Sequence, residues 1–362
     1  MPLSSPIRVA VLGCGAFGKN HLRVWRQLAA ADPNLHLTAL VDPDALRAAA
    51  LAAEFSIPAY PSVTALLDAQ PNLAAASVAV PTVQHAPVAA ALLAAGVDVL
   101  IEKPLTSSLE EADHLLHLAT QHNRILQVGH LERFNPAVQA VRPLLNRPMF
   151  FEAHRLSIFT PRSLDVDVVL DLMIDDLDIV CSFAASSVRE VHAVGLPILS
   201  PKVDIANVRV EFASGCVANF TASRVSTEQV RKLRFFQPHQ YLSIDYARQD
   251  VLSIDVSDNP NPQALAAASL AAPAEALQHP TPQFGLHKLP ITKNEPLRLE
   301  LESFLHAVRT RTQPIVSAHD GRTALALALD ILSAIRAHHH RAGLANLPLP
   351  SQFSLTDFQV KP

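Results

Sequence analysis

The stretch Ile7-Arg8-Val9-Ala10-Val11-Leu12-Gly13-Cys14-Gly15-Ala16-Phe17-Gly18 decides the fold. Its first half is a short apolar run that is typical of a buried strand, and its second half has the pattern G-x-G-x-x-G. A helical pattern begins at Lys19 and places Leu22, Trp25 and Leu28 on one face. Strand, glycine loop and helix, in this order, predict a turn that binds a dinucleotide.

Each glycine of this loop has a separate predicted role. Gly13 permits the tight turn, Gly15 lets the backbone approach a pyrophosphate, and Gly18 allows close packing of helix on strand. Ala16 and Phe17 then lie in the first turn of the helix, whose N-terminus favours a negatively charged phosphate. We therefore expect all five residues to contact the cofactor.

A second strand, residues 35–41, leads directly to Asp42. An acidic residue about twenty positions beyond the glycines typically accepts hydrogen bonds from the ribose hydroxyls of NAD. Its charge would repel a 2′-phosphate, which favours NAD over NADP. Asp42 is also placed to cap the next helix, beside Pro43 and Asp44, and this structural alternative stays open.

Helical and extended segments continue to alternate up to residue 128, which predicts an α/β fold with a doubly wound parallel sheet. Ligands of such sheets bind beyond the carboxyl ends of the strands. Pro81, Thr82 and His85 follow one strand, so we expect them near the nicotinamide, although His85 is equally typical of a helix start. The next strand ends in Glu102-Lys103-Pro104, and we expect Glu102 and Lys103 at the cofactor site as well.

Lys103 is the first candidate for catalysis. A lysine at the mouth of a strand beside a nicotinamide can position a substrate hydroxyl and take part in its proton transfer. The simpler alternative is a surface lysine that pairs with Glu102.

After residue 148 the strands follow one another closely, which predicts a C-terminal α+β domain with a large, open, mainly antiparallel sheet. A helix over residues 166–184 would cover one face, and the other face would meet water or another subunit. Spacings of four and three place Asp171, Asp175 and Asp178 on one side of that helix, where we expect them to face a cleft. Residues 259–290 lack periodicity and are expected to form a long loop or lid. The expected strands are residues 149–159, 189–198, 204–213, 215–226, 231–236, 241–246 and 251–256.

Composition limits the class of protein. The chain has 362 residues, enough for two domains, and 49% of them are apolar. A net charge of −4 argues against a nucleic-acid partner. The three cysteines are far apart, which indicates a reducing compartment and no metal site. Neither a signal peptide nor a membrane span is apparent, so we expect a cytoplasmic location and no membrane partner.

The glycine loop, Asp42 and the Glu102-Lys103-Pro104 triplet resemble the family of glucose-fructose oxidoreductase, inositol dehydrogenase and their MocA-like relatives. The resemblance implies an NAD-binding Rossmann domain, here residues 1–128, and a domain for substrate binding and oligomerisation, here residues 129–362, whose last helices can pack back on the first domain. It also implies that the lysine of the triplet lies in the active site, and that the assembly is a homodimer or homotetramer formed through the C-terminal sheet.

Two further motifs, Val128-Gly129-His130-Leu131-Glu132-Arg133-Phe134-Asn135-Pro136 and Glu152-Ala153-His154-Arg155-Leu156, resemble a subgroup acting on UDP-N-acetylglucosamine or its uronic acid. That subgroup oxidises the C3 hydroxyl of the sugar to a ketone. Arginine suits a diphosphate because its planar guanidinium can bind two oxygens at once. For each of the three arginines Arg133, Arg155 and Arg162, a surface salt bridge is an equal alternative. The residues expected to bind the substrate are His130, Arg133, Phe134, Asn135, Arg155 and Arg162.

One position departs from the family. The resemblance implies an aspartate on the helix and a histidine four residues later, which serve proton transfer together with the lysine. Asp171 matches the aspartate, but Asp175 stands in place of the histidine. A carboxylate is a weak base at neutral pH unless burial or a like charge, such as Asp171, raises its pKa.

The sequence leaves three possibilities for the base: Asp175 acts, Lys103 acts, or activity is impaired. The leading hypothesis is NAD-dependent oxidation of the C3 hydroxyl of UDP-N-acetylglucosamine, with Lys103, Asp171 and Asp175 handling the proton. The alternatives are a dehydrogenase of a free sugar or inositol, and an NAD-binding homologue that has lost catalysis.

Overall fold

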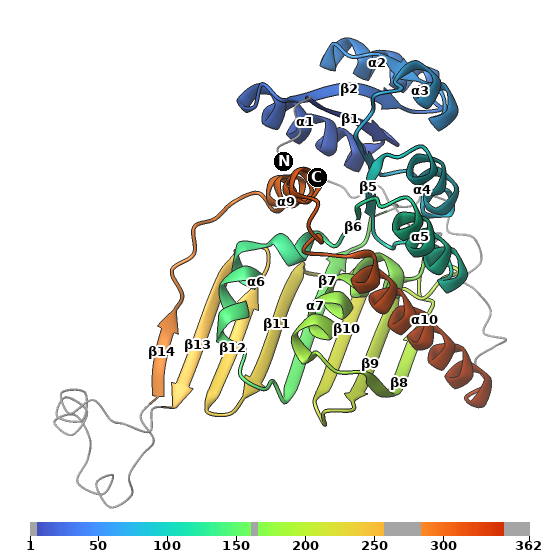
Figure 1. Ribbon diagram of the computed structural model, residues 1–362. Coiled ribbons are helices and arrows are strands. Elements are labelled where there is room, and N and C mark those ends of the chain that lie inside the picture. Colours follow the sequence, from blue (N-terminus) through green and yellow to red (C-terminus); the bar gives the residue numbers. More distant parts are fainter. Residues whose placement is uncertain (1–5, 161–165, 257–283, 344–362) are drawn as a thin grey trace, which may run out of the picture.

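The computed structural model describes residues 6–160, 166–256 and 284–343. These residues form two sheets, with the parallel sheet above the antiparallel one in Figure 1. Both halves of the predicted fold are confirmed.

The first sheet has six parallel strands in the order β3-β2-β1-β4-β5-β6. This order reverses direction between β1 and β4, and such a reversal opens a crevice for ligands at the carboxyl edge. The strands are β1 (Ile7–Leu12), β2 (Leu35–Val41), β3 (Ala59–Tyr60), β4 (Ala75–Val78), β5 (Asp98–Glu102) and β6 (Leu126–Gly129). The helices between them are α1 (Ala16–Ala31), α2 (Ala45–Phe55), α3 (Val63–Ala69), α4 (His85–Ala94) and α5 (Leu109–Gln121).

Two helices from the end of the chain complete the cover of this sheet. The helix α9 (Pro296–Thr310) packs beside α1, where the rings of Phe304 and Trp25 meet edge to face with centroids 6.4 Å apart. The helix α10 (Ala318–Arg341) begins with a capping box formed by Ser317 and Asp320. Its apolar residues join the core beside α5 and also the core of the second sheet.

The second sheet has eight strands in the order β14-β13-β12-β11-β7-β10-β9-β8, and only β7 and β10 pair in parallel. Figure 1 shows α6 (Pro136–Val141), α7 (Ile174–Ala184) and α10 on one face of this sheet. Apolar side chains from that face, among them Phe151, Phe220 and Phe235, form the core beneath these helices. The strands are β7 (Phe150–Ile158), β8 (Val188–Leu196), β9 (Ile205–Phe212), β10 (Val217–Ser226), β11 (Val230–Gln237), β12 (Gln240–Asp245), β13 (Asp250–Val256) and β14 (Phe284–Lys288).

Two predicted segments need correction. The stretch expected to form a loop over residues 259–290 contains β14, which pairs with β13, while residues 257–283 lie outside the described part. The helix expected over residues 166–184 is divided: a π-helical turn, Val169–Met173, precedes α7. This wide turn changes the angle between residues before and after it, so a regular spacing of four no longer places side chains on one line.

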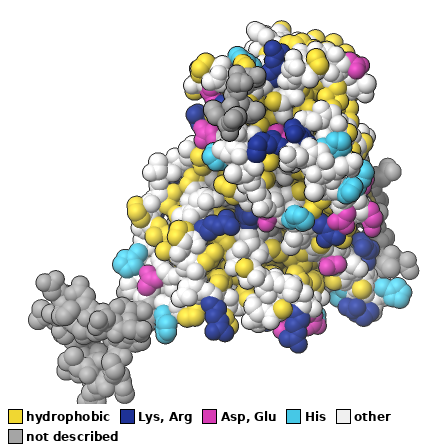
Figure 2. Space-filling model, in the orientation of Figure 1, with side chains coloured by type: hydrophobic (Ala, Val, Ile, Leu, Met, Phe, Trp, Pro, Cys, Tyr) yellow, Lys and Arg dark blue, Asp and Glu magenta, His cyan; other side chains and the backbone are white. Residues whose placement is uncertain are grey.

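On the face drawn in Figure 2, basic and acidic side chains are interspersed, including at the level where the two sheets meet. Within the described residues, no helix is both long and apolar enough to cross a membrane.

Candidate active site

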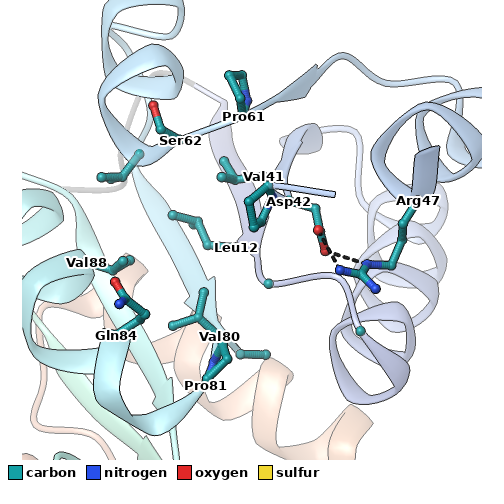
Figure 3. Close-up of a pocket in the computed structure, with 15 residues that line it drawn as sticks. Leu12, Val41, Asp42, Arg47, Pro61, Ser62, Val80, Pro81, Gln84 and Val88 are labelled. Atoms are coloured by element: carbon teal, nitrogen blue, oxygen red, sulfur yellow. Dashed lines mark hydrogen bonds and ion pairs between the residues drawn. The ribbon is translucent and has the colours of Figure 1, made fainter. Parts of the chain in front are cut away.

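A cavity of about 770 Å³ opens at the carboxyl ends of β1, β2 and β4 (Figure 3). This volume is typical of sites for small molecules and cofactors. The side chains of Leu12, Val80 and Val88 make its walls apolar, and Gly13 and Gly15 form part of its rim. The cavity therefore lies at the predicted dinucleotide site.

The three glycines have the geometry that their predicted roles require. Gly13 has φ +82°, and a Cβ there would lie 2.5 Å from the Val80 nitrogen. A Cβ on Gly18 would lie 1.8 Å from the Gly13 carbonyl oxygen, so this glycine permits the contact of helix and loop. A Cβ on Gly15 would meet nothing within 4 Å and would project into open space.

The first turn of α1 offers free donors. Its N-cap is Gly15, which supplies no side-chain hydrogen bond, and Ala16 and Phe17 follow it. Uncapped N–H groups at a helix N-terminus bind phosphate readily. The cavity, the open glycine and these amides together fit a pyrophosphate cofactor such as NAD, which would supply a hydride acceptor when bound.

Asp42 is held by an arginine that lies outside the glycine-loop motif. Arg47 of α2 donates from Nε and Nη2 to the two Asp42 carboxylate oxygens, each at 2.9 Å (Figure 3). Burial opposes ionisation of Asp42, but the hydrogen bonds from Arg47, Asp44 and Cys14 outweigh it and lower the pKa of this carboxyl. The helix is capped by Asp44 instead, which accepts from the backbone of Arg47 at 3.1 Å.

Other residues predicted at the cofactor site divide into lining and supporting ones. Pro81 lines the cavity, and Thr82 begins the short 3₁₀ turn that follows it. The buried His85 ring instead contacts the carbonyl oxygens of Val80 and Pro104, at 2.9 and 2.8 Å. His85 thus holds the segment after Lys103 in place through these contacts. Its ring is not among the residues that line the cavity.

Glu102 is also a supporting residue. Its carboxylate contacts His21 Nε2 at 2.9 Å, and both side chains are buried. Phe17 packs edge to face on His21 with a centroid separation of 5.3 Å. The alternative that Lys103 pairs with Glu102 is not supported, because Glu102 contacts His21 while Lys103 contacts Asp175 and the Asp171 carbonyl.

The catalytic candidates meet across the two sheets. Lys103 Nζ lies 3.6 Å from Asp175 Oδ2 and donates a hydrogen bond to the main-chain carbonyl of Asp171. On the other side of the Asp175 carboxylate, His130 Nδ1 lies 4.0 Å from Oδ1. Lys103 and Asp175 thus form the predicted pair, while Asp171 takes part through its backbone. Asp178 is buried next to Arg133 and also interacts electrostatically with His130.

The charge of Asp175 is set by its neighbours. Burial favours the neutral acid, but the positive charges of Lys103 and Arg155, followed by His130 and Arg231, outweigh it and lower the pKa of Asp175. The expectation that Asp171 raises this pKa is therefore wrong: the nearest groups are cationic. Asp175 is an ionised carboxylate at neutral pH.

Comparison with known proteins identifies the fold and its chemistry. A profile of an oxidoreductase family with an NAD-binding Rossmann fold matches residues 7–130. UDP-N-acetylglucosamine 3-dehydrogenase of Acidithiobacillus ferrooxidans is 33% identical over 336 residues, which are 92% of this chain and 99% of that one. The chain belongs to the Gfo/Idh/MocA family. It is an oxidoreductase with an NAD-type Rossmann domain.

Solved structures of relatives agree. The structure of the Acidithiobacillus ferrooxidans dehydrogenase superposes with a TM-score of 0.80 and covers 91% of this chain and 98% of its own. Levoglucosan dehydrogenase in complex with NADH and levoglucosan is 17% identical, has a TM-score of 0.77 and covers 92% and 98% of the two chains. The second comparison shows that this fold is shared at low sequence identity.

Within this family member, the residues predicted to contact the sugar nucleotide are mostly interior. Arg155 donates hydrogen bonds from Nε and Nη2 to the two carboxylate oxygens of Asp176, at 2.8 and 3.0 Å. Its guanidinium also lies over the Tyr246 ring. Arg133 pairs with Asp178 and Asp320, both at 3.6 Å. These internal pairs favour a structural role for the two arginines, and their contact with a diphosphate stays a prediction.

Phe134 and Asn135 also serve the fold. Phe134 belongs to the core of the first sheet. Asn135 caps α6 by accepting from Ala137 at 3.0 Å and donates to the Tyr246 carbonyl oxygen at 3.0 Å. Arg162 lies outside the described residues.

Several residues of the site have no strong local signal. Asp176 is one position from Asp175, but only the fold shows that it holds Arg155. Glu300 of α9 is fully buried, and burial, with Glu102 and Asp175 adding to it, raises the pKa of this carboxyl well above its usual range. His21 resembles any other residue of a helical pattern, and its contact with Glu102 joins positions 81 residues apart.

Proposed function

We propose that the protein oxidises the C3 hydroxyl of a UDP-N-acetylglucosamine-type nucleotide sugar to the 3-keto sugar, with NAD as hydride acceptor. The observation that supports it most is the ion pair of Lys103 and Asp175, which lies at the same carboxyl edge of the first sheet as the dinucleotide cavity. A relative that is 33% identical over nearly its full length carries this activity in its name.

The chain supplies binding and orientation in this reaction. The amides of the Gly13–Gly18 loop would hold the pyrophosphate, and the strand ends would direct the nicotinamide toward Lys103. Lys103, fixed by the Asp171 carbonyl, would donate a hydrogen bond to the substrate oxygen. The ionised Asp175 would receive the hydroxyl proton as the hydride leaves carbon.

NAD is the cofactor that we propose in preference to NADP. Asp42 borders the cavity at the position that binds adenosine ribose hydroxyls in NAD enzymes. We also propose that the protein is cytoplasmic and forms a homodimer or homotetramer through the second sheet, whose face opposite α7 carries side chains with intermediate exposure such as Glu152, His154 and Leu156.

The alternative substrates are a free sugar or inositol. The scyllo-inositol 2-dehydrogenase of Bacillus subtilis is 27% identical over 235 residues, covering 61% of this chain and 68% of its own. That likeness is weaker and shorter than the one to the nucleotide-sugar enzyme, so we rank this alternative second.

The test is a coupled assay. Protein and NAD are mixed with UDP-N-acetylglucosamine, its uronic acid, glucose or inositol, and an aminotransferase removes the ketone while reduced nicotinamide is followed. We expect turnover with a nucleotide sugar and not with the free sugars. Lys103→Met should abolish turnover and keep NAD binding, whereas the exposed Lys202→Met should change neither.

Two outcomes would replace the proposal. Turnover of inositol or glucose alone would establish the second candidate. NAD binding without any turnover, followed by gain of activity in Asp175→His, would indicate a homologue that has lost catalysis.

A further inference from the structure

His130 is a buried imidazole that the fold leaves without a hydrogen bond. Its side chain is 1% exposed, and neither ring nitrogen has a hydrogen-bond partner among the described residues. Buried polar groups are nearly always paired, because an unpaired one costs free energy. The carboxylate of Asp175 lies 4.0 Å from Nδ1 of this ring.

The sheet places this ring beside the catalytic lysine. In the register of β5 and β6, Glu102 lies opposite Gly129, so Lys103 and His130 leave neighbouring strands at the same level. The side chain of Lys103 is 24% exposed, that of Asp175 13% and that of His130 1%. Burial therefore increases from Lys103 through Asp175 to His130.

The Asp175 carboxylate joins the other two. Its Oδ2 faces Lys103 and Arg155, at 3.6 and 3.7 Å, while its Oδ1 faces His130. An ionised carboxylate can take a proton at one oxygen and release it from the other, but it holds that proton weakly at neutral pH. A neutral imidazole holds it better.

We propose that His130 accepts the substrate proton by way of Asp175, and so supplies the imidazole that position 175 lacks. The inference rests on the proposed dehydrogenase function. The C–H bond of the substrate carbon breaks and its electron pair leaves with the hydrogen as hydride to NAD, while the O–H bond breaks and its proton passes through Asp175 to Nδ1 of His130. The carbonyl forms, and the proton later leaves to solvent.

The remaining charges around the pair are consistent with this path. Lys103, Arg155 and Arg231 keep Asp175 ionised, so it is ready to accept. Asp178 also interacts with His130, and burial raises the pKa of the Asp178 carboxyl. Glu300 also interacts with Asp175, and burial raises the pKa of Glu300 well above its usual range. The 4.0 Å separation must close by about 1 Å for transfer, as catalytic hydrogen bonds commonly do when substrate binds.

Rescue is the decisive test. His130→Asn should lower kcat by about 100-fold or more while NAD affinity, read from Trp25 fluorescence, stays the same. Asp175→His places an imidazole at the position implied by the family, so the double variant His130→Asn/Asp175→His should recover most of the lost kcat. The exposed His117→Asn is the matched control and should behave like wild type.

The pH profile gives a second readout. Wild-type kcat should fall on the acid side, within about pH 5–8, where imidazoles become protonated. His130→Asn should lack this limb, and the double variant should regain it. Full activity of His130→Asn, or a loss that Asp175→His does not rescue although NAD still binds, would overturn the proposal.

A spectroscopic arm separates this inference from the proposed function. If UDP-N-acetylglucosamine is not oxidised but another sugar is, the same variants are compared with that sugar. If no sugar is oxidised, the proposed function fails, and the pairing is examined in the cofactor-free protein by NMR. Asp175→Asn should then move the ring resonances of His130, and an unchanged spectrum would refute the pairing.

Discussion

The bidentate contact between Arg47 and Asp42 places opposite charges at the edge of the cofactor cavity. The Arg47 side chain is 44% exposed, so its guanidinium can turn toward a 2′-phosphate, whereas the Asp42 carboxylate would repel one. We predict that wild type binds NADP measurably, though more weakly than NAD. Arg47→Ala should weaken NADP binding by about 10- to 100-fold, the effect of one lost charged hydrogen bond.

The measurement is the Kd of each cofactor by calorimetry. NAD affinity of Arg47→Ala should stay within about threefold of wild type, because Asp42 is retained. Arg189→Ala, on the exposed edge of the second sheet, is the control. Equal losses for the two cofactors would show that Arg47 only orders Asp42.

Glu300 gives a prediction about pH. Its pKa in the folded protein is raised by burial, so the folded state holds a proton that the unfolded chain releases above about pH 4.3. This group's contribution to stability is therefore fully present below the unfolded pKa and is lost as pH rises toward the folded one. Glu300→Gln should remove that loss.

Denaturant melts at pH 5 and pH 8 test this. The variant should be more stable than wild type at pH 8, with a smaller difference at pH 5, and each unit of pKa shift corresponds to about 1.4 kcal/mol. The exposed Glu228→Gln should show no such dependence. A Glu300→Gln protein that is less stable at both values would mean that the carboxyl has a partner which glutamine cannot replace.

At the scale of elements, the loop between β1 and α1 contains one glycine that serves cofactor binding and another that serves packing. Gly15→Ala adds a methyl group in open space and should fold normally, but NAD should bind at least about tenfold more weakly because the methyl occupies the pyrophosphate path. Gly18→Ala would bring its Cβ within 1.8 Å of the Gly13 carbonyl oxygen and should lower the melting temperature as well. Thermal melts and cofactor titration of both variants make the comparison. Gly15→Ala with unchanged NAD affinity would contradict the assigned binding mode.

The elements themselves were largely predictable from local pattern. The parallel sheet and seven strands of the second sheet lie where hydrophobic periodicity predicts them. Local pattern does not predict the strand β14, because its pairing partner β13 is distant in sequence and its own five residues alternate only weakly. The π-helical turn before α7 was missed because periodicity assumes a constant residue angle.

The site was predictable in position but less so in detail. Strand ends specify where Lys103 and His130 emerge, so sequence order suffices for them. Local sequence does not reveal which charged side chains form ion pairs with one another. Arg155 is therefore predicted as a phosphate ligand, although it forms an ion pair with Asp176. The same limit hid Arg47, whose contact depends on the turn that Asp42 and Asp44 form.

For the whole molecule, the contact of Phe304 with Trp25 measures how firmly α9 is joined to the first sheet. Both rings are fully buried, and Trp25 is the single tryptophan of the chain. Phe304→Ala should destabilise the protein by about 3–5 kcal/mol and change the tryptophan emission of the folded state. Phe236→Ala, at a ring that is 40% exposed, should cost much less and leave the emission unchanged. Equal stability of the two variants would show that α9 is loosely attached.

The return of α9 and α10 to the first sheet has a consequence for recombination between relatives. A cofactor module cut at residue 128 would lack the apolar cover that residues 296–341 provide, and a graft would pair that cover with a foreign sheet. A working chimera must therefore inherit residues 7–129 and 296–341 from one parent, and the exchanged part between them must still fit the face of α10 that packs on the second sheet. In terms of inheritance, the first sheet and its helices are encoded in two separated pieces, and the second sheet is an insertion between them.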